Sequence, residues 1–457
     1  YQDWQQQQYY EDSLAWEDDP LYGWCNKNVN KEGRHYNLYT DGLKIYSTID
    51  SRMQRYAEES VSEHVVGYLQ PAFDKEQKKN PRRPYNRSLP VSRVNDDLQR
   101  AKRQSARYVT MKAAGIPVEK IEESFNEPRE MTVYSPVGDI DTLMTPLDSL
   151  KYYKGFLHSG FVCMDMEMGD VKAYVGDVNY SHFRYDMAGQ ARRQVGSTIK
   201  PYLYTLAMDE GMWPCDSTVN DTISLIDGNG QRWSPRDTHD KNRGEIVSLA
   251  WGLAQSSNWI SAYLMSLYTP EQLVRMMRSF GIEGRLDPVV SLCLGPCEVS
   301  VAEMVGAYTT FPNQGIRMEP LMVTHIEDAN GNLLANFVPK TYEVISETTS
   351  YKMVYMLQNV MDHGTGVRVR LRYNIKAPMG GKTGTSQNHS DGWFMGFTPS
   401  LVGGVWVGGE DRSIHFDNLS AGQGANMALP IWALYMQKVY GCPELGYTED
   451  EDFNIPE

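Results

Sequence analysis

Residues 194–201 read Gln194-Val195-Gly196-Ser197-Thr198-Ile199-Lys200-Pro201, a serine followed three residues later by a lysine. Few helix breakers follow Pro201 before Asp209, and proline is tolerated in a first turn, so a helix is predicted from Ser197. Residues three apart share a helix face, which puts the Lys200 amine within reach of the Ser197 hydroxyl. A desolvated lysine can take the proton of a serine, and a helix N-terminus offers N–H groups to an oxyanion. Alone the pair is a weak signal, because a serine N-cap with a solvated lysine gives the same pattern.

Two later stretches make the pattern specific. Ala254-Gln255-Ser256-Ser257-Asn258 lies within a run, 246–267, that is predicted helical with a break near its middle. Gly380-Gly381-Lys382-Thr383-Gly384-Thr385-Ser386 precedes a strand-like apolar run, 393–409. In chain order the motifs read Ser-x-x-Lys, Ser-x-Asn and Lys-Thr-Gly, a set known from penicillin-binding proteins and class A β-lactamases.

The surrounding residues extend this match. They are Arg193 to Pro201, Leu253 to Asn258, Gly381 to Thr385, Asp391 to Phe394 and Gly396 to Pro399. With them, the chain resembles the transpeptidase domain of class A, bifunctional penicillin-binding proteins. Val195 stands where family members often carry proline, and Ile199 where they carry a bulkier aromatic residue. We find no glutamate-centred glycosyltransferase motif, so the resemblance covers the linker region and roughly residues 155–440.

The resemblance implies a mixed α+β fold of the penicillin-binding-protein and serine β-lactamase type. We expect a central antiparallel sheet flanked by helices, plus a small N-terminal linker and accessory region. A hairpin pattern at 161–176 fits two adjacent strands of that sheet. The predicted divisions are a tail or linker (1–41), an interdomain linker and accessory region (42–154), a penicillin-binding transpeptidase domain (155–445) and an acidic C-terminal tail (446–457).

The resemblance also implies the roles of the motif residues. Ser197 would attack a carbonyl to form an ester, with Lys200 as the leading proton acceptor. Burial, or the nearby cation of Lys382, would favour the neutral form of Lys200 for part of the time. Ser256 would relay a proton to the leaving amine, and Asn258 would orient Lys200 and hold a substrate amide.

The third motif is the candidate strand edge for substrate binding. Its residues Lys382-Thr383-Gly384-Thr385 read as a strand edge where Gly384 leaves room for a peptide. Lys382 with the hydroxyls of Thr383 and Thr385 suits a C-terminal carboxylate. By resemblance, the backbone N–H groups of Ser197 and Thr385 form the oxyanion hole. The segment 214–243 is turn-rich and is expected to overhang this cleft.

Composition narrows the function classes. A net charge of −14 argues against a nucleic-acid binder. The nine histidines show no paired ligand spacing, so we expect no metal site, and the family resemblance implies no cofactor. The six cysteines lack metal-type pairs, and unpaired thiols are favoured. No apolar run of membrane-spanning length occurs, and Tyr1 does not begin a signal peptide, so we expect a fragment of a longer chain.

The predicted function is a serine-type peptidoglycan D,D-transpeptidase that cross-links stem peptides ending in D-Ala-D-Ala and is acylated by β-lactams. Its expected place is extracytoplasmic, on the periplasmic face, with membrane contact only through segments missing from this chain. Cell-wall machinery proteins are possible partners. The alternatives are a D,D-carboxypeptidase or β-lactamase on the same scaffold, with hydrolysis as a possible side activity, or a non-enzymatic β-lactam sensor.

Overall fold

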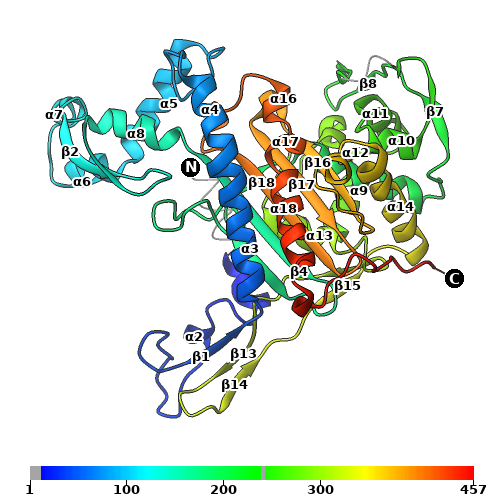
Figure 1. Cartoon of the computed structure of the whole chain (residues 1–457), viewed down its shortest axis with the longest axis horizontal. Helices are drawn as coiled ribbons and strands as arrows, with labels where there is room; N and C mark the ends of the chain where they lie inside the picture. The colour runs from blue at the N-terminus through cyan, green and yellow to red at the C-terminus, as the bar shows by residue number, and fades with distance from the viewer. Residues whose placement is uncertain (1–11, 238–241, 457) are drawn as a thin grey trace.

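The computed structural model describes residues 12–237 and 242–456, so residues 1–11 and 457 of the two predicted tails lie outside the described part. Within it, five antiparallel strands form a sheet in the order β16-β17-β18-β4-β5 (Figure 1). The strands are β16 (Gly380–Thr385), β17 (Asp391–Phe397), β18 (Leu401–Gly409), β4 (Leu157–Asp165) and β5 (Val171–Val175). The predicted central antiparallel sheet flanked by helices is confirmed.

Helices cover both faces of this sheet. Along β4, Phe161 and Cys163 belong to one buried core, whereas Val162 and Met164 belong to a second core on the opposite face. The first core is completed by α3 (Ser51–Val61), η1 (Ser62–Leu69) and α18 (Leu429–Tyr440), and the second by α9 (Lys200–Asp209), α13 (Val301–Tyr308) and α14 (Glu347–His363). An antiparallel sheet with one wet face would alternate apolar and polar residues. Here every residue of β17 and β18 is buried, which explains the continuous apolar run.

The helical lobe beside β16 differs locally from the sequence prediction. The first turn, η2 (Gly196–Ile199), is a 3-10 turn, and α-helix α9 begins only at Lys200. The predicted helix 246–267 is wrong for its first three residues, because β10 (Ile246–Ser248) pairs with β7 (Ser217–Val219). The predicted break is present between α10 (Leu249–Ala254) and α11 (Asn258–Leu267).

Shorter elements complete this lobe and the sheet margins. They are β6 (Arg193–Gln194), β8 (Leu225–Ile226), β9 (Arg232–Trp233), α12 (Pro270–Ser279), η4 (Val290–Leu294), β11 (Glu298–Val299), β12 (Ile316–Met318), β15 (Thr341–Glu343), α15 (Arg368–Leu371), η5 (Gln387–His389), α16 (Leu419–Gly422), α17 (Gly424–Met427) and η6 (Pro443–Leu445). All six cysteine thiols are free.

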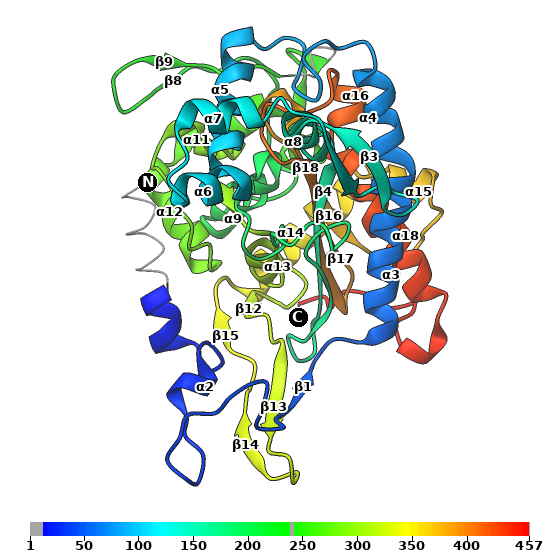
Figure 2. The same ribbon diagram turned by 90° about the vertical axis from the view of Figure 1, so that its left-hand side faces the viewer.

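The N-terminal part adds two extensions. In the first, β1 (Lys44–Ser47) joins the hairpin of β13 (Val323–Glu327) and β14 (Leu333–Asn336), which projects from the body (Figure 2). The described part of the predicted 1–41 tail includes the short helix α2 (Trp24–Lys27).

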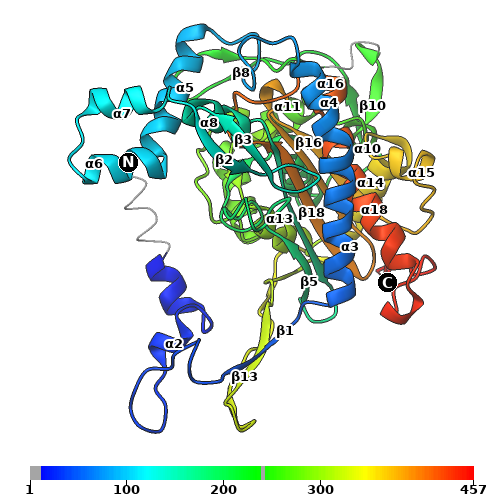
Figure 3. The same ribbon diagram turned by 60° about the vertical axis from the view of Figure 1, so that its left-hand side comes forward.

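The second extension is an accessory region with a small core of its own, Tyr108, Ile121 and Phe125. Figure 3 shows α6 and α7 at its outer end. Its elements are α4 (Gln70–Gln77), α5 (Val91–Gln104), α6 (Ala106–Ala113), α7 (Val118–Ser124), β2 (Arg129–Val133), β3 (Ile140–Met144) and α8 (Pro146–Lys154).

Candidate active site

The turn that carries Ser197 lies against strand β16. Gly196 has φ +54°, a left-handed conformation that favours glycine, and a Cβ there would sit 2.6 Å from the Thr385 carbonyl oxygen. From the other side, a Cβ on Gly384 would sit 2.7 Å from the Val195 carbonyl oxygen. The two glycines therefore let the Ser197 turn and the Lys-Thr-Gly strand approach closely. Ser197 itself is partly exposed, so its side chain can be reached from solvent.

The second motif sits in the break between α10 and α11. Ser256 has φ +58°, which is strained for a residue with a Cβ. Its backbone N–H donates to the Leu253 carbonyl at 3.0 Å, which ends α10 in a tight turn. Ser257 then caps α11, accepting from the Ile260 N–H at 3.3 Å. This geometry turns the Ser256 and Asn258 side chains toward the lysines of the other two motifs.

Lys200 is fully buried and is held by the second motif. Its Nζ donates to the Ser256 carbonyl at 2.6 Å, to Asn258 Oδ1 at 2.7 Å and to Ser256 Oγ at 3.3 Å. Among the described residues, no hydrogen bond joins this amine to the Ser197 hydroxyl. A neutral amine has two N–H groups and one lone pair. The Ser256 carbonyl and the Asn258 amide oxygen accept hydrogen bonds from both N–H groups, so the lone pair can accept a hydroxyl proton.

Lys382 approaches the same serine from β16. Its Nζ donates to Ser256 Oγ at 2.9 Å and to the Thr383 carbonyl at 2.9 Å, and its side chain is fully buried. The Ser256 hydroxyl thus lies between two amines that come from segments about 180 residues apart, 200 and 382. This arrangement permits a proton to pass along a lysine–serine–lysine chain.

Both lysines are poorly able to stay charged. Burial lowers the pKa of Lys200 to about 8, partly opposed by the negative charge of Asp237. Burial, together with the neighbouring Lys200, lowers the pKa of Lys382 well below its usual range. Two like charges this close disfavour each other, so the pair titrates as a unit and cannot readily carry two protons. One amine is therefore available as a base at near-neutral pH.

Two residues that the sequence analysis did not single out hold Asn258. The Arg236 carbonyl accepts from Asn258 Nδ2 at 2.7 Å, which fixes the amide so that its oxygen faces Lys200. Asp237 Oδ2 accepts from the Asn258 backbone N–H at 2.6 Å. Both belong to the turn-rich segment 214–243, but their distance along the chain from Asn258 gives no periodic signal. The segment does contact the second motif, as expected from a segment at the cleft.

A buried ion pair anchors the start of the turn that carries Ser197. Arg193 Nε donates to Asp391 Oδ1 at 2.8 Å, and the guanidinium stacks 4.5 Å from the centre of the Trp406 ring. The Trp393 indole N–H donates to the Gln194 carbonyl at 2.8 Å. Asp391 and Trp393 therefore serve the fold by tying residues 193–194 to the sheet.

The hydroxyls of the third motif face different groups. Thr385 Oγ1 accepts from the Gly424 N–H at 3.0 Å, so its own proton is free to donate. Thr383 Oγ1 lies 2.7 Å from Thr365 Oγ1, in the connection between α14 and α15. Thr365 was not singled out from the sequence, because an isolated threonine carries no motif.

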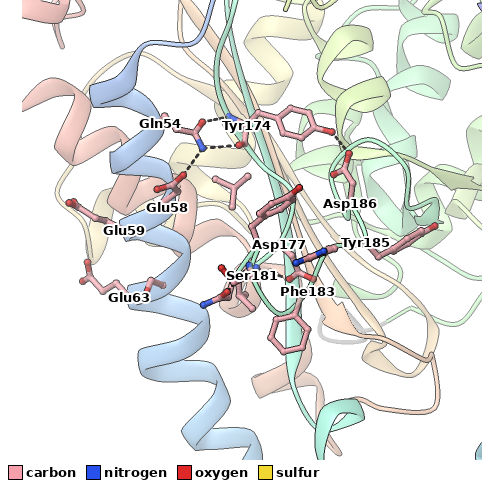
Figure 4. Close-up of a pocket in the computed structure, with 17 residues that line it drawn as sticks. Gln54, Glu58, Glu59, Glu63, Tyr174, Asp177, Ser181, Phe183, Tyr185 and Asp186 are labelled. Carbon is pink, nitrogen blue, oxygen red and sulfur yellow. Dashed lines mark hydrogen bonds between the residues drawn. The ribbon is translucent and has the colours of Figure 1, made fainter. Parts of the chain in front are cut away.

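A pocket of about 980 Å³ lies elsewhere, between α3 with η1 and the segment that follows β5 (Figure 4). Two of its polar side chains are engaged in the fold: Tyr174 Oη donates to Asp186 at 2.5 Å, and Gln54 forms hydrogen bonds with the Tyr174 backbone. Glu58, Glu59 and Glu63 line its helical wall. None of the predicted motif residues lines this pocket, so the Ser197 cluster remains the candidate active site.

In 12–237 and 242–456, no group of three or more His, Cys, Asp and Glu side chains is placed to hold a metal ion. Over the same residues, no helix combines the length and apolar character needed to cross a membrane.

Comparison with known families gives two matches. Residues 159–410 match the family described as penicillin binding protein transpeptidase domain, and residues 80–157 match the penicillin-binding protein middle domain. The first match covers more than half of the chain and includes all three motifs.

Individual proteins agree with the family matches. Penicillin-binding protein 1A of Aquifex aeolicus is 31% identical over 434 residues, which cover 92% of this chain and 56% of that protein. The chain thus spans about half the length of the curated relatives it matches. The crystal structure of penicillin-binding protein 1A from Haemophilus influenzae superposes with a TM-score of 0.66 at 20% identity, covering 93% of this chain and 69% of that one. The PonA1 protein of Mycobacterium tuberculosis, solved in complex with penicillin V, gives 0.60 at 19% identity, covering 94% and 92%.

Proposed function

Because this chain belongs to the penicillin-binding protein transpeptidase family, we propose that it is a serine acyltransferase that cross-links peptidoglycan stem peptides ending in D-Ala-D-Ala. The observation that carries the proposal is the buried cluster in which Ser256 Oγ lies 3.3 Å from Lys200 Nζ and 2.9 Å from Lys382 Nζ. The partly exposed Ser197 sits one helical turn before Lys200.

Acylation would begin at Ser197. The lone pair of neutral Lys200 takes the hydroxyl proton as Ser197 Oγ attacks the carbonyl carbon of the penultimate D-alanine. The backbone N–H groups of Ser197 and Thr385 stabilise the oxyanion. The C–N bond then breaks, and the leaving D-alanine amine takes a proton from Ser256, which regains one from Lys200.

Substrate binding would use the third motif. Protonated Lys382 and the Thr385 hydroxyl hold the terminal carboxylate, and Thr383 acts with them. Asn258 holds a substrate amide and orients Lys200. The ester is resolved when the amine of a second stem peptide attacks it, which restores Ser197 and forms the cross-link.

β-Lactams would acylate the same serine. Opening of the lactam C–N bond leaves the amine attached to the acyl group, so the deacylating attack is blocked and the adduct persists. The penicillin V complex of PonA1 and the imipenem acyl-enzyme complex of penicillin-binding protein A from M. tuberculosis support this expectation by fold similarity.

The first experiment is intact-mass measurement after incubation with benzylpenicillin. We expect one stable adduct on the native chain and on Ser266→Ala, a serine at the end of α11 that is bonded to the Tyr263 carbonyl. Ser197→Ala should gain none. An adduct on Ser197→Ala, or none on the native chain, would refute Ser197 as the acylated nucleophile.

A second experiment separates transfer from hydrolysis. A D-Ala-D-Ala donor peptide is incubated with and without an added amine acceptor such as D-alanine or glycine. Donor consumption that yields aminolysis product in proportion to the acceptor supports a transpeptidase. Hydrolysis of the donor alone would indicate a carboxypeptidase. Rapid loss of the penicillin adduct with consumption of the drug would indicate a β-lactamase. A stable adduct without any peptide turnover would indicate a sensor.

We also propose an extracytoplasmic place for this domain. Uncross-linked stem peptides are exposed on the outer side of the plasma membrane. We further propose contacts with cell-wall machinery proteins, and a division into 1–41 and 42–154 as linker and accessory region, 155–445 as the catalytic domain and 446–457 as a tail.

A further inference from the structure

Asp237 is bonded to the start of the helix that carries the second motif. Its Oδ2 accepts from the Asn258 N–H at 2.6 Å, from Ser257 Oγ at 2.7 Å and from the Trp259 N–H at 3.1 Å. The first N–H groups of a helix have no partner within the helix. A carboxylate there satisfies two of them and also interacts favourably with the helix dipole.

The neighbouring residue holds the same asparagine by its side chain. The Arg236 carbonyl accepts a hydrogen bond from Asn258 Nδ2 at 2.7 Å, and Asn258 Oδ1 accepts one from Lys200 Nζ at 2.7 Å. Two consecutive residues therefore fix both the backbone and the amide of Asn258. A shift of residues 236–237 would therefore displace the Asn258 side chain and, through it, the Lys200 amine.

The carboxylate also acts through its charge. Negative Asp237 favours the protonated form of Lys200, opposing the larger effect of burial. From the other elements packed around Lys200, Lys382 of β16 disfavours a second positive charge, and the Cys293 thiol of η4 stays neutral because burial raises its pKa to about 12. Of these groups, Asp237 supplies the negative charge.

We propose that Asp237 is a positioning residue for acylation, which orients Lys200 through Asn258 and brings a negative charge to the start of α11. The inference rests on the proposed acyl-transfer function. The Asp237 side chain has two properties that can be tested separately, its hydrogen-bond acceptor oxygen and its negative charge.

Two substitutions test these properties separately. Asp237→Asn keeps an acceptor oxygen for the Asn258 N–H and removes the charge. Asp237→Ala removes both. The matched control is Asp227→Asn, the same change in the same segment, at a turn where the carboxylate accepts from the Asn229 and Gln231 N–H groups.

The readout is the second-order rate of acylation by benzylpenicillin between pH 5 and pH 9, with thermal unfolding as a check of folding. For Asp237→Asn, we expect a maximal rate within a few-fold of the native value and an acid limb displaced to lower pH by roughly one unit. For Asp237→Ala, the maximal rate should fall by roughly tenfold to a hundredfold, because the base is misplaced. Asp227→Asn should overlay the native curve.

Each result decides a stated point. An Asp237→Asn profile that overlays the native one would overturn the charge role, and an Asp237→Ala rate equal to the native rate would overturn the positioning role. If Asp237→Ala fails to fold, Asp237→Asn still tests the charge, and its full maximal rate supports the acceptor role. A native chain that is not acylated at all refutes the proposed function, which is distinct from either outcome.

Discussion

The amine of Lys200 is surrounded by a carbonyl, an amide oxygen and a hydroxyl, all within 3.3 Å of its Nζ. None of these three groups carries a negative charge, so none offsets the cost of burying a cation. The negative charge of Asp237 favours the protonated amine, but burial outweighs it. A base suited to neutral pH therefore results from what surrounds the lysine.

The first prediction concerns pH. Burial lowers the pKa of Lys200 to about 8. Because the neutral amine is the proposed base, the acylation rate should rise with pH toward that value and fall roughly tenfold per unit below it. Lys382 must be protonated to hold a carboxylate, and because burial and the neighbouring Lys200 lower its pKa well below its usual range, it depends on the bound carboxylate to keep that proton. Stopped-flow acylation between pH 5 and pH 9.5 checks this, and a flat profile would contradict Lys200 as the base.

At the scale of elements, the break between α10 and α11 stores strain at Ser256. Its left-handed φ of +58° aims the hydroxyl between two lysines. Glycine adopts this conformation without cost, but it has no hydroxyl. The chain thus accepts strain where the proposed chemistry needs a side chain.

The second prediction separates strain from chemistry. Ser256→Gly and Ser256→Ala both remove the hydroxyl, so both should slow acylation to a similar degree. Ser256→Gly should be the more stable of the two by roughly 1 kcal/mol, because it relieves the left-handed strain. Chemical denaturation compares their free energies of unfolding. Equal stability would show that the backbone at 256 is not strained, and unequal acylation would show that the backbone contributes to chemistry.

The third prediction concerns the contact of β16 with the turn that carries Ser197. A Cβ at Gly384 would lie 2.7 Å from the Val195 carbonyl oxygen and 2.9 Å from Thr198 Cγ2. Gly384→Ala should therefore push the turn away, lower the free energy of unfolding by about 1–3 kcal/mol and reduce acylation. Gly228→Ala, where a Cβ meets nothing within 4 Å, is the matched control and should change neither. Unimpaired acylation in Gly384→Ala would mean that the two segments move apart without consequence.

At the scale of the whole molecule, a lysine fastens the accessory region to the sheet. Lys154, the last residue of α8, donates to Glu410 at 2.9 Å and to Asp411 at 2.7 Å, just beyond β18. Its side chain is 8% exposed, whereas the two carboxylates are 52% and 33% exposed. The amine is thus the buried partner of a partly solvated pair of charges.

The fourth prediction follows from this junction. Lys154→Met should lower the free energy of unfolding by roughly 1 kcal/mol, a modest value because water can still reach both carboxylates. Acylation per folded molecule should be unchanged. Lys151→Met, on the same helix but 36% exposed and 3.8 Å from Asp148, should stay within about 0.5 kcal/mol of native. Equal stability of the two variants, in thermal unfolding, would show that the junction is not held by Lys154.

Much of the molecule could be predicted from local pattern. The motifs at 197, 256 and 382 are short and ordered along the chain, and the apolar runs of β17 and β18 indicate buried strands. Together with the family resemblance they predicted a central antiparallel sheet flanked by helices, which is confirmed. Two errors, the helix start at Ser197 and the helix at 246–248, lie at element boundaries. There a 3-10 turn and pairing with β7 override local propensity.

The sequence by itself determined which chemical groups are available and in what order. Only the tertiary structure decided that Lys200 bonds Ser256 and Asn258, and that Asp237 caps α11. It also decided that Gly196 lies against Thr385. The physical reason is range: helix and strand periodicities relate residues a few positions apart, whereas these contacts join residues 21 to about 190 positions apart. Their partners are set by the path of the chain through the fold, and so is the burial that lowers the pKa of Lys200.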